Sequence, residues 1–133
     1  MEMPPAAQRH IDNDRVVWFT SVTDGGAPAP NPVWFVADGN DLMVFSEPTS
    51  RRVHNIGQRP LVALHFNSDP HGGDVWIITG TATIHHGVKP SSAPGYLDKY
   101  RASIEGELQT TVEAIDATYN TEIRVHPINV RTT

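Results

Sequence analysis

The sequence contains no cysteine among its 133 residues. This absence excludes disulfide bonds, zinc sites with thiolate ligands and cysteine nucleophiles, and it fits a reducing compartment. Long hydrophobic runs are also missing, because no apolar stretch approaches the roughly 20 residues that a membrane-spanning helix needs. Residues 1–11 lack the apolar middle of a secretory signal. We therefore expect a cytoplasmic protein with no membrane partner.

Basic residues are scarce as well. Ten lysines and arginines face fifteen aspartates and glutamates, which gives a formal net charge of −5. Nucleic-acid-binding domains usually present a basic face, so we expect no nucleic-acid partner. Three of the ten basic residues, Arg51, Arg52 and Arg59, nevertheless fall within nine positions. A chain of this length has room for one core, and we predict a single domain over residues 1–133.

The sequence does contain a series of strand signals. Short segments rich in β-branched and aromatic residues are separated by turn sequences such as DGG and DGND. Six strands are predicted, at residues 15–23, 27–37, 42–45, 61–66, 75–86 and 122–130. Pro28, Pro30 and Pro32 alternate in the second strand, so their missing N–H donors fall on one side, which should be a sheet edge. Gly80 is expected at a bulge or bend of the fifth strand.

Two regions carry helical signals instead. Thr49 or Ser50 can cap a helix of two to three turns that ends near Gly57. Between residues 90 and 118, apolar side chains recur at helical spacing and predict two further helices. The helices do not alternate regularly with the strands, which argues against a doubly wound sheet. The pattern predicts a mainly β (α+β) fold, a small six-stranded barrel with a few short helices.

The segment SEPTSRRVHN, residues 46–55, is the strongest candidate site. If a helix starts here, the N–H groups of its first turn lack intrahelical partners and favour an anion. Arginine adds a planar, permanently charged fork that suits phosphate. An anion pocket would draw on Ser46, Thr49, Ser50, Arg51 and Arg52. The alternative is a capped surface helix with solvated arginines, and the residues alone leave both interpretations open.

Aromatic and histidine residues suggest further sites, with weaker support. Trp34 and Phe35 could pack a planar ring system, although such residues more often belong to a core. The seven histidines include the neighbours His85 and His86, which face opposite sides of a regular strand and do not readily share one ion. We expect no metal site. Neither a GxSxG motif nor a GxxxxGK phosphate loop is present.

The order of these motifs resembles that of a known family. The resemblance is to the pyridoxamine-phosphate-oxidase-like proteins, a flavin-binding family of split barrels. It lies in the runs WFTSVTDGGAPAPNPVWFV, VFSEPTSRRVHNIGQRPLVALHF and GDVWIITGTATI. The resemblance covers about residues 14–86 and extends more loosely to IRVHPINV near the end. It is strongest to short actinobacterial members that depend on the deazaflavin coenzyme F420. The resemblance implies a homodimer of six-stranded split barrels with the cofactor in a groove between the subunits.

The resemblance also implies roles for individual residues. Residues 32–35 would run along the isoalloxazine or deazaflavin ring, and residues 46–55 would hold the phosphate. Many relatives have lysine three residues before the asparagine, where this chain has Arg52, which keeps the charge and offers a fork. The implied cofactor-binding residues are Pro32, Val33, Trp34, Phe35, Ser46, Thr49, Ser50, Arg51, Arg52 and Asn55. Replacing both arginines by alanine is expected to weaken cofactor binding and to leave the melting temperature of the empty protein nearly unchanged.

The activity that the resemblance implies is that of an oxidoreductase, a reductase that uses F420 to transfer a hydride to a small conjugated substrate. The cofactor carries the chemistry, so no catalytic residue is predicted. If a protein acid is needed, His54 or a water molecule is the candidate. Two alternatives stay open: an FMN-dependent flavin reductase or oxidase of the same fold, and a cofactor-binding module without turnover. The sequence ends in VRTT without the C-terminal arginine and histidine motif of the oxidases proper, so we expect no vitamin B6 oxidation.

Overall fold

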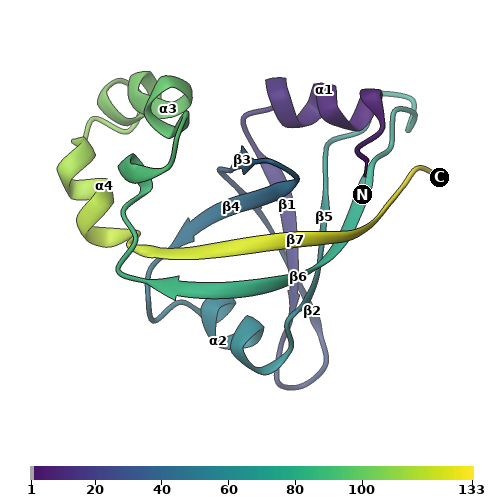
Figure 1. The fold of residues 1–133 in the computed structure, drawn as a ribbon, viewed down its shortest axis with the longest axis horizontal. Helices are drawn as coiled ribbons and strands as arrows, with labels where there is room; N and C mark the ends of the chain where they lie inside the picture. The colour runs from purple at the N-terminus through teal and green to yellow at the C-terminus, as the bar shows by residue number, and fades with distance from the viewer. Residues whose placement is uncertain (1) are drawn as a thin grey trace.

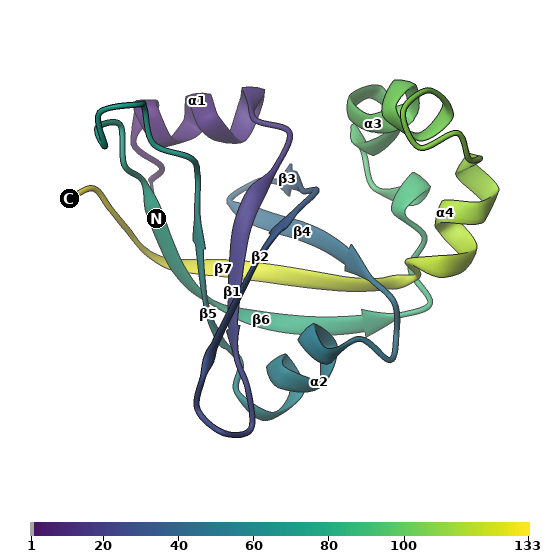
Figure 2. The same ribbon diagram turned by 180° about the vertical axis from the view of Figure 1, so that it is seen from behind.

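A single antiparallel sheet organises the computed structural model, which describes residues 2–133 (Figures 1 and 2). Its seven strands lie in the order β2-β1-β5-β6-β7-β4-β3. The strands are β1 (Val17–Val22), β2 (Pro28–Val33), β3 (Val36–Asp38), β4 (Asp41–Ser46), β5 (Leu61–His65), β6 (Ile77–His86) and β7 (Thr121–Arg131). The helices are α1 (Pro5–Asn13), α2 (Arg51–Gln58), the 3-10 turn η1 (Pro90–Ser92), α3 (Tyr96–Glu105) and α4 (Val112–Thr118).

The mainly β class predicted from the sequence is confirmed, but the sheet has seven strands instead of six. The pairing among the described residues does not close into a ring, because β2 and β3 form the two ends of the sheet. The extra strand arises where the predicted strand 27–37 breaks at Trp34 and Phe35. There the N–H of Phe35 donates to the Tyr100 hydroxyl at 2.9 Å, and its carbonyl accepts from Lys99 Nζ at 2.8 Å. Side chains of α3 thus replace a neighbouring strand as hydrogen-bond partners.

The sheet edge at β2 is the one that its prolines predict. Pro28, Pro30 and Pro32 lie opposite residues of β1, and no other strand in residues 2–133 pairs with β2. Proline has no N–H to donate to a ladder, so a strand with three prolines is confined to an edge.

The sequence patterns do not predict helix α1. Its N-cap is Pro4 and its first residue is Pro5, where a missing N–H costs no intrahelical hydrogen bond. Only Ala7 and Ile11 are buried among its nine residues. Two buried positions make too short a periodic pattern to stand out from a polar segment.

The longest pair in the sheet, β6 with β7, contains an irregularity at Gly80. Thr79 pairs with Asn129 and Gly80 with Pro127, so the register shifts between these two pairs. A Cβ atom at Gly80 would lie 2.5 Å from the carbonyl oxygen of His126. Only glycine therefore permits this close approach of two backbones. The bulge or bend expected at Gly80 is confirmed.

Two clusters of buried side chains hold these elements together. The larger joins the strands to α1 and α2, and its members with 0% exposure include Phe19, Phe35, Leu64, Ile78 and Val125. The smaller joins α3 and α4 to β3 and β4, and it contains Tyr96 and Tyr100, with Trp34 packed against it. Both ribbon views show α3 and α4 together at one end of the molecule, away from α1 and α2 (Figures 1 and 2). Trp34 therefore lies where the helical end meets the sheet.

Candidate cofactor site

Helix α2 begins where the sequence predicts an anion pocket. Ser50 is its N-cap, and the Ser50 hydroxyl accepts a hydrogen bond from the N–H of Val53 at 3.2 Å. The N–H groups of Arg51 and Arg52, in the first turn, have no acceptor among the described residues. Free N–H groups at a helix start carry the positive end of the helix dipole, so this position favours an anion.

Arg52 is half-buried beside the start of α2. Its Nη1 donates to Ser46 Oγ at 2.8 Å, and its guanidinium carbon lies 5.7 Å from the centre of the Phe19 ring. Burial lowers the pKa of Arg52 from its ordinary value, but a guanidinium remains protonated throughout the neutral range. Its Nε and Nη2 make no hydrogen bond within residues 2–133, so both can donate to a ligand.

Two cavities meet at Arg52. The smaller, about 180 Å³, is lined by Ser21, Ala29, Asn31, Ser50, Arg51, Arg52 and Asn55. The larger, about 240 Å³, is lined by Val33, Trp34, Phe45, Arg52, Tyr96, Leu108, Ile115 and Tyr119. We call the first the polar cavity and the second the aromatic cavity. One guanidinium group therefore borders a surface rich in hydroxyl and amide groups and a surface rich in aromatic rings.

The structure brings six of the ten residues implied by the resemblance to these cavities. Val33 and Trp34 line the aromatic cavity, Ser50, Arg51 and Asn55 line the polar cavity, and Arg52 lines both.

The other four lie elsewhere. Phe35 belongs to the core, with 0% exposure and its ring 5.9 Å from that of Phe66. Pro32 and Thr49 are exposed and line neither cavity. Ser46 is buried and reaches the site only through its hydrogen bond with Arg52.

Asn55 supports the polar cavity from inside the protein. Its side chain is 3% exposed, and its Nδ2 donates to Ser21 Oγ, also buried, at 3.1 Å. This bond joins α2 to β1, and both of its residues line the polar cavity. Asn55 therefore holds α2 in position, and so do Val53 and Ile56, which belong to the larger core cluster.

Trp34 forms a wall of the aromatic cavity, and α3 holds it in place. Its ring stacks on Tyr100 with a centroid separation of 4.3 Å and an interplanar angle of 1°. The Tyr100 hydroxyl in turn donates to the carbonyl of Arg15 at 2.7 Å. Lys99 Nζ lies 3.6 Å from the centre of the Phe35 ring, and burial lowers the Lys99 pKa to about 8. The backbone around Trp34 is thus fixed by two consecutive side chains of α3.

Sequence reasoning misses the wall that faces Trp34. Tyr96 and Ile115 are expected only as helix-packing residues, and Phe45 only as part of a strand. The structure places all three in the lining of the aromatic cavity, together with the exposed Leu108 and Tyr119. The available signal was the high aromatic content of the predicted helix, but nothing in its spacing connects α3 to Arg52.

His54, the candidate acid, lies away from both cavities. Its side chain is exposed, and its Nε2 lies 2.9 Å from a carboxylate oxygen of Asp24. Asp24 also pairs with Arg59, so these three residues tie the β1–β2 turn to α2. We assign His54 no part in the site.

The family of the chain follows from comparison with known proteins. Residues 3–133 match the family described as pyridoxamine 5'-phosphate oxidase. The chain belongs to this family. No curated protein matches it as a relative.

Several solved structures share the fold of this pyridoxamine 5'-phosphate oxidase family member. An F420 reductase is 21% identical over 97% of this chain and 98% of its own, with a TM-score of 0.77. General stress protein 26 from Bacillus anthracis is 17% identical over 94% of this chain and 88% of its own, with a TM-score of 0.64. The heme storage protein HutZ from Vibrio cholerae is 13% identical over 99% of this chain and 95% of its own, with a TM-score of 0.66. TM-scores of this size at such low identities show a shared fold and nothing beyond it.

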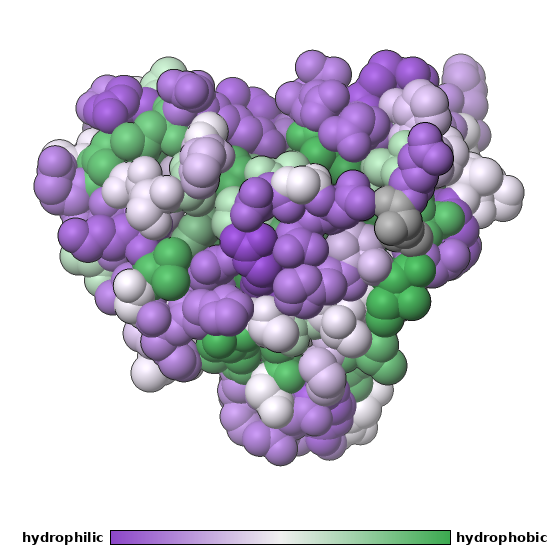
Figure 3. Space-filling model, in the orientation of Figure 1, coloured by the Kyte–Doolittle hydropathy of each residue, from purple (hydrophilic) through white to green (hydrophobic). Residues whose placement is uncertain are grey.

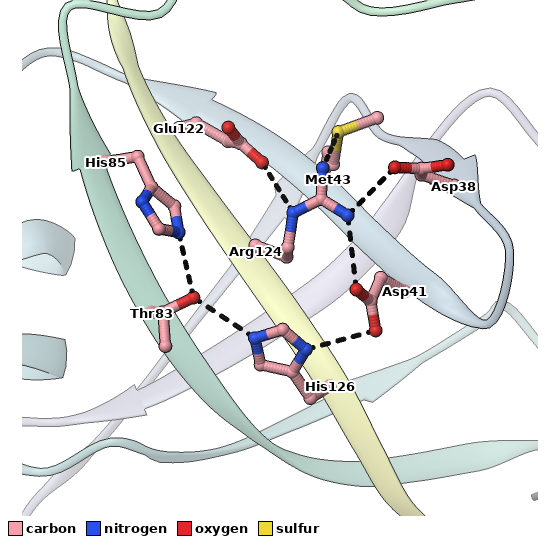
Figure 4. Close-up of polar contacts among 8 residues, drawn as sticks. All are labelled: Asp38, Asp41, Met43, Thr83, His85, Glu122, Arg124 and His126. Atoms are coloured by element: carbon pink, nitrogen blue, oxygen red, sulfur yellow. Dashed lines mark hydrogen bonds and ion pairs between the residues drawn. The ribbon is translucent and has the colours of Figure 1, made fainter.

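In this family member, ion pairs anchor the hairpin that leads from Trp34 to Phe45. Figure 4 shows Arg124 of β7 between three carboxylates, with distances of 3.0 Å to Asp38, 3.1 Å to Asp41 and 2.8 Å to Glu122. Because Asp38 and Asp41 flank the turn between β3 and β4, these contacts tie the hairpin to the sheet. The network therefore fixes β4, the strand that contributes Phe45 to the aromatic cavity.

The same network accounts for one of the two histidines considered for a metal site. His85 lies 3.2 Å from Thr83 Oγ1, which also contacts His126 (Figure 4). His86 contacts Thr121 instead. No three histidine, aspartate or glutamate side chains of residues 2–133 form a metal-binding group.

No helix within residues 2–133 is both long enough and apolar enough to cross a membrane. Figure 3 shows a largely hydrophilic face with separate apolar patches, one of them over the end formed by α3 and α4.

Proposed function

We propose that this protein is an oxidoreductase, a reductase that binds coenzyme F420 and transfers a hydride to a small conjugated substrate. The observation that supports this most is the position of Arg52 at the junction of the polar and aromatic cavities. A deazaflavin or flavin cofactor combines a flat ring with a phosphate-bearing tail. One molecule of this kind needs an anion site and an aromatic wall side by side.

The residues of the polar cavity fit a phosphate. The free N–H groups of Arg51 and Arg52, the guanidinium groups of both side chains and the hydroxyl of Ser50 supply donors and positive charge. Among residues 2–133, no carboxylate lines this cavity to oppose an anion. We assign these three residues to the phosphate and Asn55 to holding α2 in place.

The residues of the aromatic cavity fit a ring. Trp34 and Val33 would flank it, while Tyr100 and Lys99 keep the Trp34 backbone in position. Bound F420 supplies a hydride through a carbon atom, which favours two-electron transfer over reaction with oxygen. The protein residues orient the ring, exclude water from it and hold its charged tail, so no nucleophile is required of them.

The fold shared with an F420 reductase supports F420 over FMN, and FMN remains the alternative cofactor. The resemblance also implies a homodimer, in which a second copy would cover the open sides of the two cavities. We propose this arrangement together with the function.

The test is a titration of the purified protein with F420 and, separately, with FMN, followed by fluorescence. We expect a colourless protein that binds F420 and then oxidises reduced F420 when an enone or quinone is added. A yellow protein with bound flavin would favour the FMN alternative. Binding of F420 without turnover across a panel of enones, quinones and tetrapyrroles would indicate a binding module, and binding of neither cofactor would contradict the proposal.

A further inference from the structure

A chain of hydrogen bonds on the exposed face of β6 and β7 joins residues that the proposed function does not use. Thr83 Oγ1 lies 3.1 Å from Nε2 of His126, and Nδ1 of His126 lies 3.1 Å from Oδ1 of Asp41. His85 Nε2 lies 3.2 Å from the same Thr83 oxygen. Figure 4 shows Thr83 in contact with both imidazole rings. A hydroxyl, an imidazole and a carboxylate thus follow one another at hydrogen-bond distance.

The register of the sheet brings these side chains together. Thr83 and His126 are diagonal neighbours, because the β6 residue that pairs with His126 lies two positions before Thr83. Thr83 and His85 are two residues apart on β6, so their side chains point to the same face. Asp41 is the first residue of β4, which pairs with the other edge of β7. Three strands therefore supply four side chains to one place on the surface.

The carboxylate of Asp41 decides where the protons of this chain lie. An ionised carboxylate only accepts hydrogen bonds, so Nδ1 of His126 carries the proton in this contact. In a neutral His126 the Nε2 atom is then an acceptor, and the Thr83 hydroxyl is its donor. Because the single hydroxyl proton of Thr83 points to His126, His85 donates its Nε2–H to the Thr83 oxygen. This assignment satisfies all three contacts.

Arg124 fixes the carboxylate that orients His126. Its Nη1 lies 3.1 Å from Oδ2 of Asp41, the oxygen that His126 does not contact. Each oxygen of Asp41 therefore has its own partner, and the carboxylate cannot turn without losing one of them. The side chain of His126 is 42% exposed, so the imidazole is held in place while small molecules can reach it.

We propose that Thr83, His126 and Asp41 form a second reactive site, a triad of nucleophile, base and orienting carboxylate that cleaves small activated esters. In a hydrolase triad the base contacts the nucleophile through one ring nitrogen and the carboxylate through the other, as His126 does. Thr83 and His85 are exposed, and neither lines the polar or the aromatic cavity. On an open surface the reactivity of the acyl group selects the substrate, which is an ester with a good leaving group, such as an aryl ester.

The reaction is an acyl transfer in two halves. In the first, the Thr83 oxygen attacks the ester carbonyl, and His126 Nε2 accepts the hydroxyl proton. The bond to the leaving phenol breaks, and His126 returns the proton to it. In the second half, His126 takes a proton from water, the hydroxide attacks the acyl group on Thr83, and the carboxylic acid and the Thr83 hydroxyl are released. His85 is the N–H donor beside the carbonyl oxygen, where negative charge develops.

The first test is covalent labelling with diisopropyl fluorophosphate, which phosphorylates activated hydroxyl groups and releases fluoride. Mass spectrometry of the wild type should show one adduct, and fragmentation should place it on Thr83. Thr83→Val keeps the shape of the side chain without the hydroxyl and should show no adduct. His126→Gln should react on the order of 100-fold more slowly, the usual contribution of a general base. An unlabelled wild type, or equal labelling of the wild type and Thr83→Val, would overturn the proposal.

Thr81→Val is the matched control. Thr81 lies two residues before Thr83, points to the same face of β6, and makes no side-chain hydrogen bond within residues 2–133. This variant removes an equivalent hydroxyl and leaves the triad intact, so it should react like the wild type. Equal losses in Thr81→Val and Thr83→Val would show that a change in the strand, and not the Thr83 hydroxyl, causes the effect.

The second test follows the release of p-nitrophenol from p-nitrophenyl acetate by the protein without added cofactor. Thr83→Val should lower kcat on the order of 100-fold. The wild type should exceed the rate of free imidazole at the same concentration, and a rate no higher than that of imidazole would contradict the triad. Because no cofactor takes part, an inactive wild type would leave the proposed F420 function unaffected.

Asp41 is a positioning residue, so its variant should change kcat and not KM. Asp41→Asn should lower kcat for p-nitrophenyl acetate about 10-fold or more, because His126 loses the partner that fixes its proton and its orientation. The KM should stay the same, since Asp41 does not touch the ester. A raised KM with an unchanged kcat would contradict the role assigned to Asp41.

Discussion

The two adjacent arginines at the start of α2 should respond differently to replacement by alanine. Arg51 is exposed, and no hydrogen bond joins its side chain to residues 2–133. Arg52 is half-buried, bonded to Ser46 and placed over Phe19. Removal of either side chain deletes one charged contact with a bound phosphate, whereas only the loss of Arg52 disturbs the empty protein.

The structure gives the size of each effect. In Arg52→Ala the hydroxyl of Ser46, which is 3% exposed, loses its partner, at a cost of about 1–3 kcal/mol. The contact with Phe19 adds about 0.5–1 kcal/mol. The sequence led us to expect a nearly unchanged melting temperature, but the half-buried position of Arg52 corrects that expectation. The free energy of unfolding of the empty protein should fall by about 1.5–4 kcal/mol, and its melting temperature by roughly 5–15 °C. Arg51→Ala should change the free energy of unfolding by less than about 0.5 kcal/mol.

Cofactor binding should weaken in both variants. A hydrogen bond to a charged group is worth about 1.5–3 kcal/mol, which is roughly 10- to 100-fold in Kd. Thermal unfolding of the empty proteins and fluorescence titration with F420 measure the two effects separately. Arg52→Lys keeps the charge without the fork, so its Kd should lie between those of the wild type and Arg52→Ala. If Arg51→Ala and Arg52→Ala both bind F420 like the wild type, no phosphate lies at the start of α2.

Three further substitutions test the fold. Gly80→Ala places a Cβ atom 2.5 Å from a backbone oxygen, so the free energy of unfolding should fall by about 1–3 kcal/mol. In the control Gly57→Ala the added Cβ has no atom within 4 Å, so this variant should stabilise α2 by up to about 1 kcal/mol. Equal unfolding midpoints of the two variants in urea would contradict the close approach of β6 and β7. His10 lies 2.7 Å from Asp14 and 2.8 Å from Asp74; burial alone would lower its pKa, but these contacts outweigh it and raise the pKa above 6.5. The contribution of the protonated His10 to stability is present below pH 6.5 and is lost as the pH rises through the raised pKa. The melting temperature of the wild type should therefore exceed that of His10→Gln at pH 5.5, and the difference should be smaller at about pH 8.5. A difference that stays constant with pH would show that the charge of His10 does not contribute to stability.

Much of the site could be anticipated because its signals are local. Ser50 caps α2 through a hydrogen bond three residues along the chain, and the two arginines follow directly. A helix start, its free N–H groups and its adjacent charges lie within a few residues of each other, so their chemistry can be inferred from order alone. The edge strand with its prolines and the bulge at Gly80 are local in the same sense.

The other half of the site depends on contacts distant in sequence. Phe35 follows Trp34 directly, yet Trp34 lines the aromatic cavity and Phe35 belongs to the core. The reason is that β2 ends before Trp34 and β3 begins after Phe35, and side chains of α3 bind the backbone between the two strands. Residues 65 positions apart decide this, since Tyr100 binds the Phe35 backbone. No periodicity of the strand itself could reveal which ring faces the cavity.

The sequence by itself determined the mainly β class, the capped helix with its arginines and the family to which the chain belongs, because alternation, capping and motif order are properties of neighbouring residues. Only the tertiary structure decided that Arg52 is half-buried at the junction of two cavities, and that Tyr96 of α3 lines one of them together with Trp34. Packing decides such matters, because the residues that line a cavity come from distant parts of the chain.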